Sequence, residues 1–242
     1  MLQVWSGWKA DTIWSTVRRV ECLRRRLPRH GLPAGRSVHP PRVLPLFHVP
    51  EPGASGRLLA ITFDDGPDPR WTPQILDVLA RHQVRATFFL IGERALAYPR
   101  IAERITQAGH AVGNHSMRHP QRFAALPPSR ILQEIRQGQD AIAQATGTAP
   151  QLFRAPAGNW STVVLRLAED TGLRAVDWSV DPKDWRSPPP SRIVRTLLRS
   201  RGGDVMLCHD GGGDRSATVR AVDVALGILR DRGAEFTSLD AT

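Results

Sequence analysis

The stretch LLAITFDDGPDP, residues 58–69, places two adjacent carboxylates, Asp64 and Asp65, directly after an apolar run. A short apolar run that ends in turn residues is typical of a buried β-strand. Asp-Gly-Pro is also ordinary turn chemistry, so these residues alone leave a solvated turn and a functional site as equal alternatives. The remainder of the sequence is needed to distinguish a solvated turn from a functional site.

Downstream of this stretch, short apolar runs alternate with segments of helical periodicity. The apolar runs predict strands at 58–63, 86–91, 111–113, 152–154, 174–180, 204–208 and 235–239. The periodic segments predict helices at 72–82, 95–109, 128–146, 161–172, 191–201 and 216–232. This alternation predicts an α/β fold with a mainly parallel sheet, and about seven strand–helix units favour a small barrel over an open sheet. In such barrels functional groups gather at the carboxyl ends of the strands, which is where the two carboxylates fall.

The first 55 residues differ in composition from the rest of the chain. Of the net charge of +10, residues 1–43 hold nine Lys or Arg and two acids, which leaves +3 for residues 44–242. The same region is rich in Trp and ends in HPPRVLPLFHVPEPGASG, residues 39–56. We therefore expect residues 1–55 to be an extension and linker, and residues 56–242 to form one domain. Contact of the extension with an anionic membrane surface or a nucleic acid is the alternative to a plain extension.

The composition also bears on location and partners. No run of about 18 apolar residues is present, so we expect no integral membrane segment. The N-terminus has charge but no apolar signal core, which predicts a cytoplasmic location, with an extracellular or cell-wall location as the alternative. Because +7 of the net charge of +10 lies in residues 1–43, we expect no nucleic-acid partner for the domain. Two cysteines make no disulfide framework, and Cys208 is expected to be a small core residue.

Candidate metal ligands follow the strand predicted at 111–113. His115 and His119, in NHSMRHP at 114–120, are spaced i, i+4, so one helical turn would bring both imidazoles to the same side. Two histidines and a carboxylate from another strand end make a recurrent catalytic zinc set with an open position for water or substrate. The alternative is a chance pair of surface histidines.

Three more strand ends carry polar groups. Arg154 lies in LFRAPAGNW at 152–160, Asp184 and Trp185 lie in DWSVDPKDW at 177–185, and His209 lies in VMLCHDGGGD at 205–214. The two Trp of the second segment suit core packing or the wall of a sugar site. The three glycines of the last segment do not follow a phosphate-loop order. Each segment alone is weak, but their regular placement at one end of every unit indicates a shared site.

These five segments, taken in order, resemble the motifs of the polysaccharide deacetylase family, the NodB-homology domain of carbohydrate esterase family 4. The motifs stand here as TFDDGPD, HSMRH, RAPAGNW, the Asp-Trp pair of DWSVDPKDW, and LCHDG. RAPAGNW and WSVDPKDW in particular resemble the rhizobial NodB chito-oligosaccharide deacetylase branch. The resemblance covers about residues 57–239 and implies a distorted (β/α) barrel.

The resemblance implies a metal-dependent site. One divalent ion would be held by Asp65, His115 and His119. Zinc is the expected ion, and such a ligand set also accepts cobalt, nickel or manganese. The first of the two adjacent acids, Asp64, would then be the general base that takes a proton from the attacking water.

The resemblance also implies roles for the remaining motif residues. His209 would be the general acid, held as an imidazolium by Asp184, and Arg154 would pair with Asp64. The backbone N–H of Ala157 would stabilise the oxyanion. The family often has an aromatic residue at that position, so the pocket would be more open here.

Two tryptophans are further candidates for substrate binding. Trp160 and Trp185 would form walls of the pocket, and simple packing is the alternative for both.

The implied activity is hydrolysis of N-acetyl groups on N-acetylglucosamine-containing oligo- or polysaccharides, such as chitin oligomers or peptidoglycan, with release of acetate. The partner would be the glycan substrate. An O-acetyl esterase acting on xylan-like polysaccharide and a non-catalytic glycan binder are the alternatives. Removal of residues 1–50 is expected to leave hydrolysis intact. The sequence predicts no oligomeric state.

Overall fold

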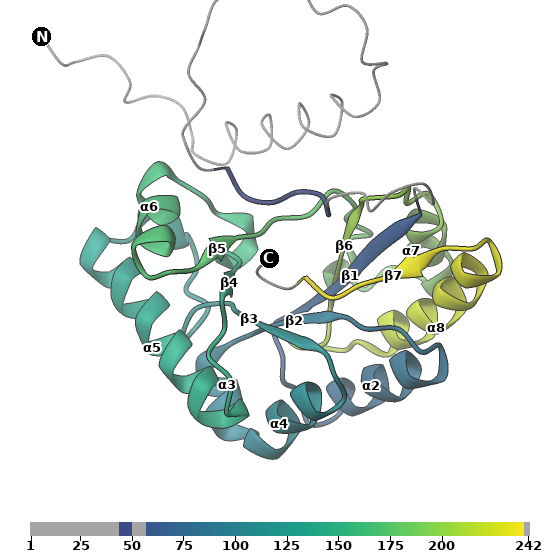
Figure 1. Cartoon of the computed structure of the whole chain (residues 1–242), viewed down its shortest axis with the longest axis horizontal. Coiled ribbons are helices and arrows are strands. Elements are labelled where there is room, and N and C mark those ends of the chain that lie inside the picture. Colours follow the sequence, from purple (N-terminus) through teal and green to yellow (C-terminus); the bar gives the residue numbers. More distant parts are fainter. Residues whose placement is uncertain (1–43, 50–56, 240–242) are drawn as a thin grey trace, which may run out of the picture.

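The computed structural model describes residues 44–49 and 57–239 (Figure 1). The strands are β1 Leu58–Asp64, β2 Thr87–Leu90, β3 Ala111–Asn114, β4 Leu152–Phe153, β5 Arg174–Ala175, β6 Val205–His209 and β7 Glu235–Phe236. The α-helices are α2 Trp71–Arg81, α3 Gly92–Ala97, α4 Pro99–Gln107, α5 Pro128–Thr146, α6 Thr162–Asp170, α7 Pro190–Leu197 and α8 Ser216–Asp231. Three single 3-10 turns are η2 Phe123–Ala125, η3 Pro156–Gly158 and η4 Asp184–Arg186.

The strands form one parallel sheet in the order β5-β4-β3-β2-β1-β6, and β7 pairs with the beginning of β1. The sheet curls, and the helices lie around its outside (Figure 1). Nearly all residues of β1 and β2 are buried, because one face of the sheet packs against helices and the other contributes to a second apolar cluster with Leu152 and Val176. The predicted distorted (β/α) barrel is confirmed.

The register of β1 with its neighbours positions the site. Asp64, the last residue of β1, pairs with His209 at the end of β6 and with Phe89 in β2. The carboxyl ends of these parallel strands therefore meet at the same edge of the sheet. Cys208, next to His209, is a buried free thiol, as expected of a core residue.

Several predicted elements are divided or shortened, and the helix predicted at 191–201 ends at Leu197 and the strand predicted at 235–239 ends at Phe236. The helix predicted at 95–109 is two helices, because the chain leaves helical geometry at Tyr98 (φ −129°, ψ 56°) and Pro99 starts α4. The strand predicted at 174–180 continues only as far as Ala175. Beyond it the chain makes isolated bridges, including one from Val180 to Met206 of β6.

Residues 44–49, which we call the N-terminal strap, are part of the packed domain. The Leu46 N–H donates to the Ala175 carbonyl (2.8 Å) and the Val49 N–H donates to the Gly203 carbonyl (2.9 Å). Phe47 and Val49 are buried. These six residues, which precede the predicted boundary at residue 55, therefore pack on the domain. The tryptophan-rich part of the extension lies outside the described residues.

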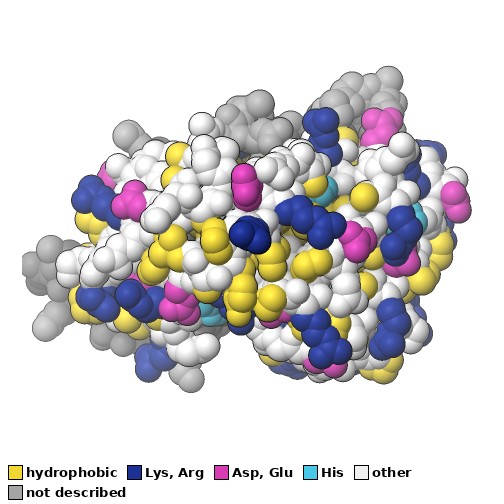
Figure 2. Space-filling view, turned by 90° about the horizontal axis from the view of Figure 1, so that it is seen from below, with side chains coloured by type: hydrophobic (Ala, Val, Ile, Leu, Met, Phe, Trp, Pro, Cys, Tyr) yellow, Lys and Arg dark blue, Asp and Glu magenta, His cyan; other side chains and the backbone are white. Residues whose placement is uncertain are grey.

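The surface seen in Figure 2 mixes charges of both signs. On this face Lys and Arg side chains are interspersed with acidic and hydrophobic ones. Among residues 44–49 and 57–239, no helix is long and apolar enough to cross a membrane.

Candidate metal centre and active site

The turn after β1 separates the two adjacent carboxylates. Asp64 is the last residue of the strand and is buried, whereas Asp65 has left-handed backbone geometry (φ 72°) and is partly exposed. Left-handed geometry is uncommon for a residue other than glycine and redirects the side chain relative to a strand. The two carboxylates therefore reach different neighbours although they are adjacent in the chain.

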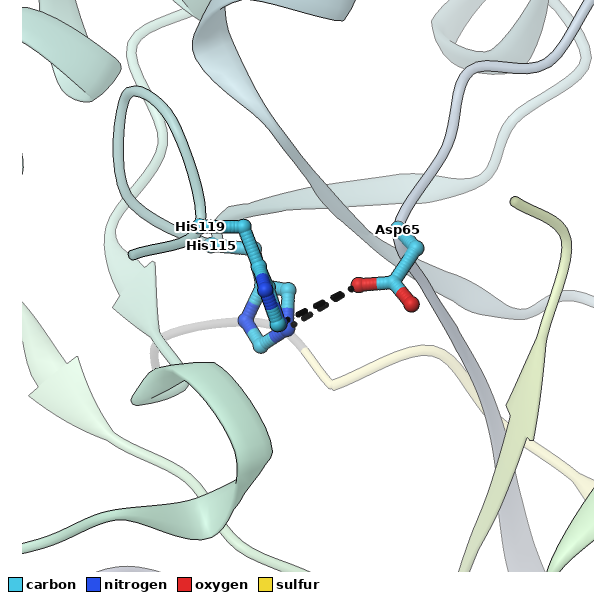
Figure 3. Close-up of side chains that lie close together, drawn as sticks. All are labelled: Asp65, His115 and His119. Atoms are coloured by element: carbon cyan, nitrogen blue, oxygen red, sulfur yellow. Dashed lines mark ion pairs between the residues drawn. The ribbon is translucent and has the colours of Figure 1, made fainter. Parts of the chain in front are cut away.

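Asp65 faces the two histidines predicted to be its partners (Figure 3). Its Oδ1 lies 3.5 Å from Nε2 of His115 and 3.4 Å from Nε2 of His119. One ligand atom from each of the three residues lies within 4.8 Å of the other two. The structure thus brings together the three residues predicted to share one ion.

The two histidines are presented by a loop, so their predicted placement on one helical turn was wrong. The loop follows β3, and its first residue, His115, donates its N–H to the Leu90 carbonyl (2.9 Å). Ser116 and His119 have left-handed geometry, and the His119 N–H donates to Ser116 Oγ (3.0 Å). Backbone reversals within five residues, rather than helical periodicity, bring the imidazoles to the same side.

The ring of His115 is prepared to act as a ligand. Its Nδ1 lies 2.8 Å from the Arg154 carbonyl, which can only accept, so the proton is on Nδ1 and Nε2 has a free lone pair. Burial first, and the neighbouring His119 second, lower the pKa of His115 to about 3. The imidazole is therefore neutral at physiological pH, as metal binding requires.

The donor set fits a divalent ion. Asp65 Oδ1 is buried and accepts no hydrogen bond from any described residue, a costly arrangement unless a cation faces it. Two imidazole nitrogens and one carboxylate oxygen suit zinc and related first-row metals and leave a coordination position open. The residues present can hold the metal that the sequence predicts.

Asp64 is held by a buried arginine. Arg154 Nη1 donates to Asp64 Oδ1 (2.7 Å) and to Thr62 Oγ1 (2.8 Å), and Nη2 donates to the Asp177 carbonyl (2.9 Å). The guanidinium lies 4.0 Å from the ring centre of Phe89. Asp64 Oδ2 lies 3.7 Å from Nε2 of His115, at the metal centre. The carboxylate is thus oriented through one oxygen and presents the other to the site.

His209 is held by Asp184. Nδ1 of the imidazole lies 2.7 Å from Asp184 Oδ1, and Asp184 Oδ2 accepts from the His209 N–H (2.8 Å) and from Thr218 Oγ1 (2.9 Å). Burial alone would lower the pKa of His209, but the charge and hydrogen bond of Asp184 outweigh it and raise the pKa to about 9. Burial opposes the charge on Asp184, but His209 and the hydrogen bonds lower the pKa of Asp184. The pair is an imidazolium–carboxylate pair at neutral pH.

Comparison with known proteins agrees with this geometry. A model of the polysaccharide deacetylase family matches residues 52–176. The chain is 41% identical over 196 residues to a chitooligosaccharide deacetylase of Bradyrhizobium sp. (strain ANU 289), an alignment that covers 76% of this chain and 89% of that protein. The chain belongs to the polysaccharide deacetylase family.

Two other relatives extend the comparison. A peptidoglycan-N-acetylglucosamine deacetylase of Bacillus cereus (strain ATCC 14579) is 38% identical over 187 residues, which covers 76% of this chain and 86% of that protein. The crystal structure of the Bc1960 peptidoglycan N-acetylglucosamine deacetylase, in complex with a benzamide ligand, superposes with a TM-score of 0.75 at 36% identity, covering 80% of this chain and 89% of that one. The family resemblance of the five motifs is confirmed.

In this polysaccharide deacetylase the third motif presents a backbone donor. Ala157 has left-handed geometry (φ 54°, ψ 20°) within η3 and is exposed. Among the described residues, none accepts a hydrogen bond from its N–H. The amide is therefore available to a substrate, which is consistent with the predicted oxyanion donor.

The two tryptophans predicted as pocket walls differ from each other. Trp185 in η4 is 45% exposed, and the Arg186 guanidinium lies 4.5 Å from its ring centre. Trp160 is fully buried and packs edge-on against Phe153, with 5.8 Å between ring centres. Of the two alternatives given for Trp160, the structure supports packing and not a pocket wall, because a side chain with no exposed surface offers no wall to a sugar.

Sequence reasoning missed two polar residues beside the site. Asp210 follows His209 directly and is fully buried, and its Oδ2 accepts a hydrogen bond from Thr72 Oγ1. Burial is the main cause that raises the pKa of Asp210 to about 7. The only signal for Asp210 in the sequence was its position after the general acid. Nothing in the sequence indicated Thr72, which lies 138 residues away from it.

Proposed function

We propose that this protein is a metal-dependent N-deacetylase that removes acetyl groups from glycans containing N-acetylglucosamine, with chitin oligomers and peptidoglycan as the candidate substrates. Relatives at about 40% identity carry these two activities in their names. The observation that carries the proposal is the convergence of a complete set of groups at one edge of the sheet. Three ligands, an arginine-bound carboxylate and a histidine paired with a buried carboxylate meet where β1, β3 and β6 end.

A divalent ion held by Asp65, His115 and His119 would supply Lewis-acid polarisation of the substrate carbonyl and of the attacking water. We propose zinc, because two imidazoles and one carboxylate with an open position make a common catalytic zinc set. Cobalt, nickel or manganese would suit the same ligands.

In the proposed reaction, Asp64 accepts one proton from water as the water oxygen forms a bond to the carbonyl carbon of the acetamide. The N–H of Ala157 donates to the carbonyl oxygen as negative charge develops there. His209 gives its Nε2 proton to the amide nitrogen as the carbon–nitrogen bond breaks. The products are the free amino sugar and acetic acid, which releases a proton to become acetate, and the proton gained by Asp64 balances the one lost by His209.

The pairing of each group supports its proposed role. Arg154 holds one oxygen of Asp64 by a charge-assisted hydrogen bond and leaves the other oxygen facing the metal centre. Asp184 keeps His209 protonated at neutral pH, and a general acid must hold its proton before the reaction. Arg154 and Asp184 thus each contact one of the two proposed catalytic groups directly.

Acetate release from N-acetylglucosamine oligomers and from peptidoglycan tests the proposal. The chelated protein is measured with and without added zinc or cobalt, beside Asp64→Asn and the exposed-acid control Asp77→Asn. We expect the rate of acetate release to depend on the metal and to fall at least ~100-fold in Asp64→Asn, because a general base typically contributes 10²–10⁴-fold to the rate. The rate in Asp77→Asn should be unchanged. Release from acetylated xylan alone would show an esterase instead. Metal binding without release from any of these substrates would show a glycan binder.

A further inference from the structure

The loops after β1 and β6 are in backbone contact. A Cβ atom at Gly66 would overlap both carboxylate oxygens of Asp210, and a Cβ atom at Gly211 would overlap the Asp65 carbonyl. Each loop therefore has a glycine where the other loop passes closest. The two loops can approach this closely only because both positions lack a side chain.

Asp210 connects the β6 loop to both ends of the β1 loop. Its N–H donates to the Asp64 carbonyl (3.1 Å), and its Oδ2 accepts from Oγ1 of Thr72 in the first turn of α2. Thr72 Oγ1 in turn accepts from the Asp68 N–H (2.7 Å). Asp210 and Thr72 are both fully buried, so water does not compete for these hydrogen bonds.

The turn between these two attachment points contains the metal ligand Asp65. Its left-handed geometry is unfavourable by roughly 1 kcal/mol or more for a non-glycine residue and persists only where the surroundings enforce it. The surroundings here are the β6 loop: Gly211 lies against the Asp65 backbone, and a Cβ at Gly212 would lie 2.9 Å from Asp65 Oδ2. The direction of the Asp65 carboxylate therefore depends on how the two loops are locked together.

We propose that Thr72 and Asp210 are positioning residues for Asp65. Their buried hydrogen bond, made across Gly66, locks the left-handed turn that aims the Asp65 carboxylate at the histidine pair. The proposal rests on the proposed function in that it takes Asp65 to be a metal ligand. Neither residue belongs to the candidate ligand set or to the proposed proton-transfer groups, so their effect is expected in metal affinity rather than in proton transfer.

Cobalt(II) titration of the metal-free protein, followed by its visible absorption, tests the proposal without turnover. Thr72→Val keeps the shape of the side chain and removes the hydroxyl, and we expect it to bind cobalt ~10-fold or more weakly, the range found when groups that orient a metal ligand are lost. Thr72→Ser restores the hydroxyl and is expected to restore the affinity. Asp210→Ala removes the acceptor and is expected to weaken binding at least as much as Thr72→Val.

Thr218→Val is the matched control. It also removes a buried threonine hydroxyl that bonds an aspartate, but that aspartate is Asp184 on the general-acid side. We expect Thr218→Val to bind cobalt as tightly as the parent protein. If Thr72→Val does not fold, Thr72→Ala is titrated instead, because it also removes the hydroxyl and introduces no misplaced methyl group.

Two results separate failure of this inference from failure of the proposed function. If the parent protein binds cobalt and releases acetate, and both Thr72→Val and Asp210→Ala bind cobalt as tightly as it does, the positioning role is wrong and the two residues serve only the packing of the loops. If the parent protein binds no cobalt, the metal site itself is wrong and the proposed function fails with it.

Discussion

At the residue scale, the buried pair of His209 and Asp184 has the largest consequence for chemistry. Burial disfavours the charged form of both groups, but each stabilises the ionised form of the other. A folded-state pKa of about 9 for His209 lies above its ordinary value of 6.5. The contribution of this imidazolium to folding stability is therefore complete below about pH 6.5 and is lost as the pH rises through about 9.

The first prediction concerns the pH dependence of the reaction. Asp184→Asn removes the largest influence that raises the pKa of His209 but leaves the imidazole buried, so the pKa of His209 falls from about 9. We expect the alkaline decline of kcat/KM, near pH 9 in the parent protein, to move to lower pH by about two units or more. The measurement is acetate release against pH.

The exposed acid Asp214, in the loop after β6, gives the control for this prediction. It is not among the groups that shift the pKa of His209, so Asp214→Asn should leave the alkaline decline in place. If the alkaline decline of kcat/KM occurred at the same pH in Asp184→Asn, a group other than His209 would be responsible for it.

At the element scale, α5 supports the loop that carries the histidine pair. The Asn114 side chain donates to the Ile135 carbonyl of α5 (2.8 Å), and Glu134 of α5 accepts from the Arg118 N–H (2.9 Å). Gly138 faces the same loop, and a Cβ atom there would lie 2.5 Å from Asn114 Oδ1 and 2.8 Å from the Ser116 carbonyl carbon. The helix can approach the loop because it has no side chain at this point.

Gly138→Ala is predicted to weaken both stability and metal binding. Alanine favours a helix over glycine by about 1 kcal/mol, but overpacking against backbone costs typically 1–3 kcal/mol and shifts the loop. We expect lower unfolding free energy and weaker cobalt binding, measured by denaturant unfolding and by titration.

Gly227→Ala in α8 tests the same helix preference without the clash. A Cβ atom at Gly227 would lie 3.4 Å from Cε1 of the His82 side chain, at the edge of ordinary contact. This variant should be neutral or more stable than the parent protein and should bind cobalt normally. Equal effects of the two substitutions would argue against close packing of α5 on the histidine loop.

At the scale of the whole molecule, the N-terminal strap completes the packed domain. It hydrogen-bonds to β5 and to the turn before β6, two regions that are not neighbours in the sheet order. Val49 belongs to an apolar cluster that includes Ala60 and Phe89 of the sheet, and the partly buried Leu46 packs against this cluster. The expectation that residues 1–50 can be removed without loss of hydrolysis is therefore revised, because such a deletion would remove the strap.

Two truncations test this. A chain that starts at residue 44 should keep its activity and melting temperature, and should leave a cation exchanger at lower salt because +7 of the net charge is gone. A chain that starts at residue 50 loses the burial of Phe47 and Val49, about 2 kcal/mol each, and should melt about 10 °C lower. The melting temperatures of both truncated chains, measured by thermal unfolding, test this prediction. Equal melting temperatures would show that the strap contributes little to the stability of the domain.

The sequence and the tertiary structure determined different features of this protein. The sequence alone predicted the (β/α) barrel, because strand and helix periods are local properties of the chain, and α5 begins and ends where its periodicity predicts. The motif order and the family resemblance also predicted which residues would converge, since parallel strands end at one edge of a sheet.

Tertiary structure alone decided how these residues are held. The left-handed turn at Asp65, the loop geometry of the histidine pair and the contact of Thr72 with Asp210 depend on segments distant in the sequence that pack together. The burial of Trp160 and the docking of the strap have the same origin. Periodicity reports whether a residue suits a helix or strand, whereas close packing between distant segments sets the direction of each side chain.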